Sequence, residues 1–295
     1  MQERRLELTV KETKKVDDLL RHELRCSSGI IRTAKGYPDG ILLSGVHAKT
    51  SDTAQPGQVL SILIANREQG DLLPTPGPLN IVYRDDDILV VNKDAGVATH
   101  PGPGHHDDTL GNFLTDYYKK QGVPYVYRPA HRLDRNTSGL MVIALHAHAQ
   151  ERLKEQLHTG DFRRVYLAVC QGVPEREEGV IEVPIGRADG SVLMRQVRPD
   201  GDCAVTRYKI MSTGNGRSLV RLELETGRTH QIRVHMSWLG YPLVGDFLYG
   251  VEDKSLIGRT ALHSWQLSLK QPLTGQRLQL EAPIPQDIAR LVNLP

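Results

Sequence analysis

The stretch SLVRLELE (residues 218–225) gives the clearest indication of the fold. Its apolar residues alternate with Arg221, Glu223 and Glu225, which is the period of a strand that buries one face. Similar strand-like runs recur from residue 79 to the carboxyl terminus: NIVYRDDDILVVNK, LMVIALH, RRVYLAVC, GVIEVPIG, CAVTRYKIM, ALHSWQLSL and RLQLEAP. Many antiparallel strands with few helices predict an α+β body with a mostly antiparallel, mixed sheet.

Helical spacing of apolar residues is found in only four segments of this body. AHAQERLKEQLH (147–158) and THQIRVHMSWLG (229–240) show it most clearly, and LGNFLTDYYKKQ (110–121) and PQDIARLV (285–292) also fit a helix. No glycine-rich nucleotide-binding loop opens any of them. We therefore expect no ATP or nicotinamide cofactor, and no other cofactor.

Residues 1–65 follow a different pattern. Apolar residues between Val16 and Leu24 have helical spacing, and Ser27 can cap a second helix through Ile30 and Ile31. The strand-like runs ILLSGVHAKT and QPGQVLSILI come next. Residues 66–78, NREQGDLLPTPGP, contain three prolines and two glycines, which is typical of a linker. The sequence thus predicts a small α/β unit (1–65), a linker (66–78) and a main domain (79–295).

Positive charge is concentrated in the amino-terminal unit. The formal net charge of the whole chain, +2, is too small to imply a polyanionic partner. Residues 1–35, however, carry nine Lys or Arg against six Asp or Glu, a net charge of +3, so the rest of the chain sums to −1. This distribution fits a unit that attracts phosphates, attached to a near-neutral body. It fits an ordinary solvated helix face equally well.

The sequence contains no membrane span and no cysteine framework. No apolar run approaches the roughly 20 residues that cross a bilayer, and the start, MQERRLELTV, lacks the apolar centre of a secretory signal. We expect a cytoplasmic protein. Cys26, Cys170 and Cys203 lie far apart without a C-x-x-C pair, so neither a disulfide framework nor a zinc site is indicated.

The polar decapeptide HRLDRNTSGL (131–140) immediately precedes the apolar run LMVIALH. A loop that a rigid strand holds in place is where catalytic groups concentrate. Asp134 lies between Arg132 and Arg135, whose charges favour the ionised carboxylate. For an isolated aspartate in such a loop, the simpler interpretation is a turn in which Asp134 or Asn136 binds the local backbone.

The decapeptide resembles the signature of the RluA family of RNA pseudouridine synthases. Four further segments resemble that family in the same order: NKDAGVATHPG, RRVYLAVCQG, ETGRTHQIRVHMSWLGYPLVGDFLYG and ALHSWQLSL. The resemblance extends from Leu79 to the carboxyl terminus and implies a catalytic domain of the pseudouridine synthase type. The preceding unit is similar to the S4-like RNA-binding domain that many members carry, although it reads Ser27-Ser28 and GILLSGVHAKT where such domains have other strings.

The resemblance implies three catalytic residues and no metal. Asp134 matches the essential carboxylate, and Arg228 corresponds to the arginine expected to pair with it. Tyr166, in RRVYLAVC, matches a tyrosine whose ring can stack on the uracil. The reaction moves the bond to ribose C1′ from N1 of uracil to C5 without redox change or net hydrolysis. A carboxylate can assist as a nucleophile or as a base.

Three more residues of the decapeptide are expected to face the substrate: His131, Arg132 and Thr137. Arg132 can fill the space of an extruded nucleotide or contact phosphate, because a stacked base hides its glycosidic bond. His131 either orders the loop or contacts RNA. The chain also reads Lys93-Asp94-Ala95-Gly96 where members commonly have Lys-Pro-Ala-Gly, which changes a turn but not the expected chemistry.

Three functions remain open at this stage. The first is isomerisation of specific uridines in structured RNA, ribosomal RNA before transfer RNA, by a monomeric enzyme. The second is a non-catalytic RNA-binding assembly factor, against which the joint presence of Asp134, Tyr166 and Arg228 argues. The third is a nucleoside or glycoside hydrolase, which would usually show a second catalytic carboxylate.

Overall fold

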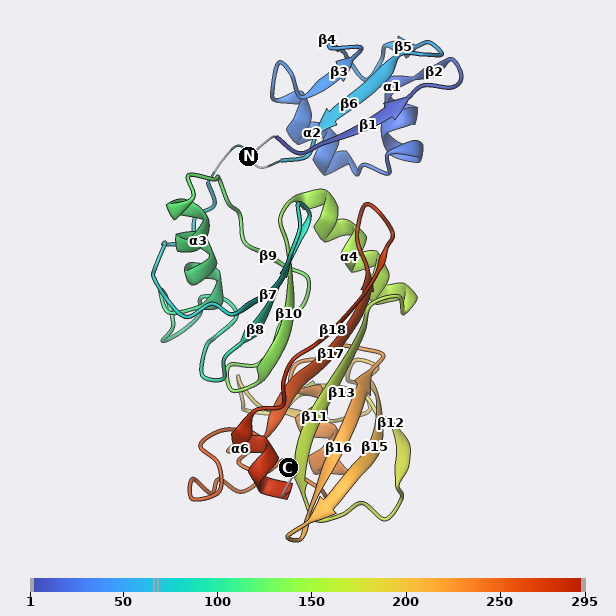
Figure 1. Cartoon of the computed structure of the whole chain (residues 1–295). Helices are drawn as coiled ribbons and strands as arrows, with labels where there is room; N and C mark the ends of the chain where they lie inside the picture. Colours follow the sequence, from blue (N-terminus) through green and yellow to red (C-terminus); the bar gives the residue numbers. More distant parts are fainter. Residues whose placement is uncertain (1–2, 66, 68, 293–295) are drawn as a thin grey trace.

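The strand-like runs of the body form one large mixed sheet. In the computed structural model, which describes residues 3–65, 67 and 69–292, the strand order is β12-β15-β16-β11-β17-β10-β8-β7, with β18 paired to β17 and β9 to β10 (Figure 1). The strands are β7 (Ile81–Arg84), β8 (Ile88–Lys93), β9 (Arg128–Pro129), β10 (Ser138–Ala144), β11 (Arg163–Gln171), β12 (Glu178–Glu182), β15 (Val205–Gly214), β16 (Arg217–Leu224), β17 (Leu262–Lys270) and β18 (Arg277–Glu281).

The pairing of these strands confirms the predicted α+β class. Each described pair in this sheet is antiparallel except β10 with β17, which is parallel. At that junction a Cβ on Gly139 would lie 2.2 Å from the Ser264 carbonyl oxygen, and the Gly139 φ is +112°. Only glycine fits there, so this residue, the ninth of the decapeptide, lets β10 and β17 approach each other directly after the loop of residues 131–137.

The four predicted helices are present. They are α3 (Leu110–Lys120), α4 (Ala147–Thr159), α5 (Gln231–Trp238) and α6 (Gln286–Ala289), which continues as the 3-10 turn η2 (Arg290–Val292). Thr109 and Asn112 form a capping box at α3, and His146 caps α4 by accepting a hydrogen bond from the Ala149 amide. A small hairpin, β13 (Ile185–Arg187) and β14 (Arg195–Val197), stands beside α5.

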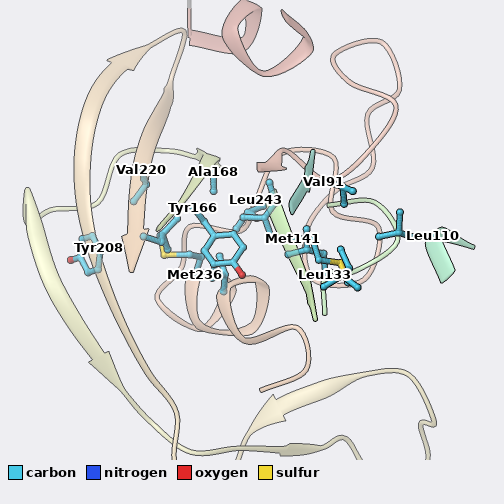
Figure 2. Close-up of a cluster of buried hydrophobic side chains, with 14 of the residues drawn as sticks. Val91, Leu110, Leu133, Met141, Tyr166, Ala168, Tyr208, Val220, Met236 and Leu243 are labelled. Atoms are coloured by element: carbon cyan, nitrogen blue, oxygen red, sulfur yellow. The ribbon is translucent and has the colours of Figure 1, made fainter. Parts of the chain in front are cut away.

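A buried cluster lies where α5 packs on the sheet. Figure 2 shows Tyr166 within it, near Met236 and Leu243. Tyr166 and Ala168 come from β11, Met236 from α5, and Leu243 from the segment after that helix. The packing fixes α5 against the sheet close to the start of β10. No helix of the described residues is long and apolar enough to span a membrane.

The amino-terminal unit has its own core and its own sheet. Its elements are β1 (Arg5–Thr9), β2 (Lys14–Lys15), α1 (Val16–Asp18) with the π-helical turn η1 (Leu19–Glu23), α2 (Ser28–Lys35), β3 (Ile41–Leu43), β4 (Val46–His47), β5 (Thr53–Ala54) and β6 (Val59–Leu63). The sheet order is β1-β6-β3-β4, with β2 and β5 as a separate pair. Ser27 caps α2 as predicted, since its side chain accepts a hydrogen bond from the Ile30 amide.

This unit contacts the body at the amino-terminal end of α4 (Figure 1). Arg4 forms a two-bond fork with Asp87: Nε donates to Oδ1 at 2.8 Å and Nη2 to Oδ2 at 3.0 Å. Ser27 donates to Glu151 at 2.6 Å, and Arg25 to Glu155 at 3.0 Å, both on α4. Asp87 is 1% exposed, so the fork holds an otherwise costly buried charge at the boundary between the two parts.

The predicted linker lies against the body where the structure describes it. The Gly70 amide donates to the Tyr125 carbonyl at 2.9 Å, and the Asn112 side chain donates to the Leu73 carbonyl at 2.8 Å. A Cβ on Gly77 would lie 2.3 Å from the Phe113 ring. The segment is irregular, as its composition predicts, but it packs on α3 instead of forming a free spacer. Positions 66 and 68 lie outside the described residues.

Candidate active site

The first seven residues of the decapeptide form a loop between β9 and β10, and its last three begin β10. The segment 93–96 holds the backbone of this loop. The Gly96 amide donates to the Arg135 carbonyl at 2.9 Å, and Lys93 Nζ donates to the same carbonyl at 3.2 Å. Lys93 is 2% exposed and also donates to the Asp94 and Val97 carbonyls. Burial lowers the pKa of Lys93 to about 7. These bonds fix the turn that carries Asp134.

The Asp134 carboxylate does not serve the local turn. The turn closes through the backbone, where the Thr137 amide donates to the Asp134 carbonyl at 3.1 Å. The side-chain Oδ2 instead accepts a hydrogen bond from Arg233 Nη1 at 3.0 Å, and His230 Nε2 lies 3.8 Å from the same oxygen. Among the residues that the structure describes, none donates to Oδ1. The carboxylate is thus held by one oxygen, and the other is available.

Arg233, and not Arg228, is the arginine that pairs with Asp134. The Arg228 Nε donates to the Cys203 carbonyl at 2.9 Å, and its Nη1 lies 3.8 Å from Asp202. Its side chain is 41% exposed, against 5% for Arg233. The expectation that Arg228 contacts Asp134 is therefore wrong, because Arg228 precedes α5 whereas Arg233 lies on the buried face of that helix.

The sequence contained a signal for Arg233 that our prediction missed. Arg233 stands between Ile232 and Val234 in a helix whose residues from Gln231 to Met236 are all buried. A charged side chain on such a face needs a carboxylate partner, since an unpaired buried charge is costly. Two carboxylates meet this need: Asp134, and Asp246, which accepts two bonds from Arg233 at 2.7 and 2.8 Å.

Tyr166 reaches the same place from β11. The register between β11 and β17 shifts between Val165 and Tyr166, an irregularity that changes where a strand side chain points. Tyr166 is 4% exposed, and burial raises the pKa of its hydroxyl. The phenol therefore stays neutral at physiological pH. Its ring forms part of the wall of the cavity that Asp134 also lines.

All six residues predicted for the site line one cavity of about 420 Å³. This volume falls in the range of small-molecule pockets. Lys154 and His158 on α4, Arg164 on β11, and His230 and Arg233 also line it, although no motif of the sequence singled them out. The charged part of the wall thus consists of arginines and a lysine around two carboxylates, Asp134 and Glu225, and Glu225 accepts a hydrogen bond from Arg207 Nε at 2.6 Å. The predicted residues that line it are His131, Arg132, Asp134, Thr137, Tyr166 and Arg228.

The structure favours loop ordering as the part played by His131. Burial lowers the pKa of His131 to about 3, so the ring is neutral. Its Nε2 accepts a hydrogen bond from the Val142 amide at 3.3 Å, and its edge meets the Phe162 ring at 5.5 Å between centroids. Thr137 is 2% exposed at the end of the loop, whereas Arg132 is exposed at the mouth of the cavity.

We found no candidate metal centre in the part of the chain that the structure describes, since no three His, Cys, Asp or Glu side chains cluster there in a way that could hold an ion. Two histidines of the loop THPGPGHH contact other side chains. His105 binds Asp108 at 2.7 Å, and His100 packs edge-on against Tyr127.

Several known proteins have sequences similar to that of this chain. A family model described as RNA pseudouridylate synthase matches residues 87–238. The uncharacterized RNA pseudouridine synthase YjbO of Bacillus subtilis is 38% identical over 272 residues, which cover 92% of this chain and 96% of that protein. The ribosomal large subunit pseudouridine synthase D of Pseudomonas aeruginosa is 38% identical over 279 residues, covering 89% and 86% of the two chains.

Solved structures agree with the sequence matches. The human RNA pseudouridylate synthase domain containing 1 superposes with a TM-score of 0.60 at 29% identity, and the match covers 75% of this chain and 90% of that one. The α+β sheet described above is thus the fold of this family. The resemblance to the RluA family is confirmed: the chain belongs to the RNA pseudouridylate synthase family and is an RNA pseudouridine synthase.

Proposed function

We propose that this pseudouridine synthase isomerises uridines in the RNA of the large ribosomal subunit, with Asp134 as the essential carboxylate. Support for the substrate comes from relatives of Pseudomonas aeruginosa and Escherichia coli that are 38% identical over most of both chains and bear the name ribosomal large subunit pseudouridine synthase D. Support for the residue comes from one observation. Asp134 lines a cavity rich in cations and is held by a buried arginine through a single oxygen, whereas Glu225, the other carboxylate of the wall, is paired with Arg207.

The reaction asks little of the protein beyond positioning and charge. The bond from uracil N1 to ribose C1′ breaks, the base turns while bound, and a bond from C5 to C1′ forms. The proton leaves C5 and one returns to N1, so atoms and electrons balance without a cofactor. As a nucleophile or as a base, the carboxylate must be ionised. Arg233 binds Oδ2 through a charged hydrogen bond, and it leaves Oδ1 open toward the substrate.

The remaining residues of the cavity suit an extruded nucleotide. The neutral phenol of Tyr166 offers a flat ring against which uracil can stack and a hydroxyl that can stay near C5. Arg132 at the mouth and Lys154 on α4 are exposed cations within reach of the phosphates that flank a flipped base. Arg228, which faces the same opening, belongs with these phosphate-binding groups and not with the acid–arginine pair.

We further propose that residues 1–65 form an S4-like RNA-binding domain, joined by residues 66–78 to a catalytic domain of residues 79–295. Several cations of the amino-terminal unit are already used within the protein, such as Arg4 on Asp87 and Arg25 on Glu155. Arg32 and Lys35, in the last turn of α2, are exposed and have no carboxylate partner among the described residues. These two side chains are the best candidates for phosphate contacts.

The experiment that tests this function measures tritium release from RNA labelled at uridine C5. Wild-type protein is incubated with transcripts of large-subunit ribosomal RNA and, separately, of transfer RNA. Asp134→Asn is compared with Asp189→Asn, which makes the same chemical change at an aspartate 87% exposed outside the cavity. We expect release from the ribosomal transcript, its loss in Asp134→Asn, and normal release in Asp189→Asn.

Each other outcome identifies a different function. Tritium release from the transfer RNA transcript alone would show that the substrate is transfer RNA and not ribosomal RNA. Free uracil in the supernatant would indicate a hydrolase, and RNA binding without release would indicate an assembly factor. Full release by Asp134→Asn would overturn the assignment of the carboxylate.

A further inference from the structure

Asp246 is a fully buried carboxylate with no place in the chemistry described so far. It is 0% exposed and follows Gly245, whose φ of +71° and close approach to the Arg259 carbonyl, 2.3 Å from where a Cβ would lie, admit only glycine. Its Oδ1 accepts the amides of Leu248 and Tyr249 at 3.0 and 3.2 Å. The carboxylate is therefore locked in position by the turn that carries it.

Asp246 determines which edge of Arg233 remains free. Arg233 Nε donates to Asp246 Oδ2 at 2.7 Å, and Nη2 donates to Oδ1 at 2.8 Å, which is the two-bond fork that a planar guanidinium forms with a carboxylate. Two of the three guanidinium nitrogens are thereby engaged. With the guanidinium plane fixed in this way, Nη1 donates the one hydrogen bond that Asp134 receives from Arg233, at 3.0 Å.

A second residue of the same turn orients the other group beside Asp134. The Tyr249 hydroxyl accepts the Arg195 amide at 2.8 Å and forms a second hydrogen bond with His230 Nδ1, also at 2.8 Å. This bond holds the His230 ring with its Nε2 3.8 Å from Asp134 Oδ2. His230 has a φ of +57°, an unusual backbone state that this contact helps to hold.

We propose that the turn Asp246–Tyr249 is the positioning element of the active site, with Asp246 fixing the guanidinium plane of Arg233 so that it binds one oxygen of Asp134 and leaves the other for the substrate. This inference rests on the proposed catalytic part of Asp134. Without Asp246, the fork of Arg233 is free to turn and bind both oxygens of Asp134. The carboxylate would then be ionised but occupied, and less able to attack or to accept a proton.

The test compares kcat and KM of Asp246→Asn with those of wild type, by tritium release from an RNA that wild type modifies. Asparagine keeps the shape and the Oδ1 acceptor but loses the charge. We expect kcat to fall about 10- to 100-fold, as for a misplacement of about 1 Å, and KM to stay within about threefold, because no RNA contact changes. Asp87→Asn is the matched control: it breaks an equally buried aspartate–arginine fork away from the cavity, so kcat at saturating RNA stays near wild type.

A double-variant cycle separates positioning from structural support. Lysine cannot form a two-bond fork, so Arg233→Lys already removes what Asp246 orients. The kcat of Arg233→Lys with Asp246→Asn should therefore equal that of Arg233→Lys alone. Tyr249→Phe, which frees the His230 ring, should lower kcat less than Asp246→Asn does.

Wild-type kcat in Asp246→Asn, or losses that multiply in the double variant, would overturn the proposal. If Asp246→Asn does not fold, Asp246→Glu replaces it. The added methylene moves the carboxylate, so unchanged kcat in that variant would equally refute positioning. Failure of the proposed function gives a different result, since wild type itself would then release no tritium or Asp134→Asn would retain it.

Discussion

Two buried aspartates in this protein each bind an arginine through both carboxylate oxygens, and their surroundings differ. Asp87, where the amino-terminal unit meets the body, takes up Arg4 and adds bonds from His146 at 2.9 Å and Gln271 at 2.5 Å. Arg4 is 34% exposed, and its described carboxylate partners are Asp87 and the neighbouring Asp86. The bonds of Asp87 all stay at the boundary between two parts of the chain.

Asp246 holds Arg233 with the same geometry, but its arginine is 5% exposed and also binds a second carboxylate, that of the half-buried Asp134. The comparison shows that an aspartate–arginine fork can either join two parts of the chain or fix the orientation of the arginine toward a third group. The difference lies in the arginine's remaining edge. At Asp87 that edge lies 3.8 Å from the exposed Asp86, and at Asp246 it faces the cavity.

The largest expected effect is on kcat, and it comes from replacing Arg233, the arginine of the pair with Asp246. Arg233→Gln should lower kcat about 100- to 1000-fold, the usual cost of removing a charged hydrogen-bond donor from a reacting group. Arg228→Gln should change kcat far less and act mainly on KM, because Arg228 faces the opening and not Asp134. Tritium-release kinetics of both variants decide the matter. Equal losses of kcat in the Arg233 and Arg228 variants would mean that the pairing of Arg233 with Asp134 does not contribute to catalysis.

Breaking the first pair should reduce stability instead of turnover. Asp87→Asn leaves Arg4 and His146 without their charged partner, and loss of one member of a buried pair costs about 3–5 kcal/mol. Asp39→Asn, which removes an exposed partner of Arg67, should change stability little. Urea unfolding at pH 7 gives both values. Similar urea midpoints for the two variants would contradict the expected contribution of Asp87 to stability.

The same pair predicts how stability depends on pH. Burial opposes ionisation of Asp87, but hydrogen bonds from His146, Arg4 and Gln271 hold its pKa well below the usual range. Because the folded-state pKa is depressed, its stabilising contribution is present above the unfolded-state pKa of about 3.9 and is lost as pH falls below it. The difference in unfolding free energy between wild type and Asp87→Asn should therefore shrink from pH 5 to pH 3. A constant difference would show that folding leaves the pKa of Asp87 unchanged, and a difference that grows toward pH 3 would show that folding raises it.

The smallest expected effect is on RNA affinity, and it concerns Arg32 and Lys35, which belong to neither aspartate–arginine pair. Arg32→Gln with Lys35→Gln should reduce the slope of log affinity for RNA against log salt by about 1.5, if each contacts one phosphate. Arg207→Gln with Lys209→Gln, whose side chains are already paired with Glu225 and Glu178, serves as the control. Filter-binding titrations at several salt concentrations supply the slopes. Deleting residues 1–65 would be less informative, because it would also uncover Asp87.

Much of the fold follows from local sequence pattern. The alternation in residues 218–225 predicts a strand that the structure contains as β16, and Ser27 predicts the start of α2. Helices α3 to α6 also follow from their spacing. Local signals such as these act within a few residues, so a single sequence can reveal them.

The site could be predicted only in part, for a physical reason. The cavity contains all six predicted residues, but which arginine of the segment 226–233 meets Asp134 depends on how α5 packs on the sheet. Arg228 and Arg233 lie five residues apart, and only packing places the second beside a loop about 100 positions earlier in the chain. Lys93 and Asp246 lie in segments that resemble the family, but the parts they play depend on similar non-local contacts, which those segments do not reveal.

The row of ion pairs Asp246–Arg233–Asp134 should respond in opposite ways to selection for stability and to selection for catalytic turnover. Buried ion pairs can often be replaced by well-packed apolar residues with no loss of stability, and sometimes with a gain. A library screened only for thermal resistance should therefore accumulate apolar replacements at positions 233 and 246. Such variants would be durable proteins that no longer modify RNA, so heat tolerance alone is a misleading guide when this enzyme is engineered.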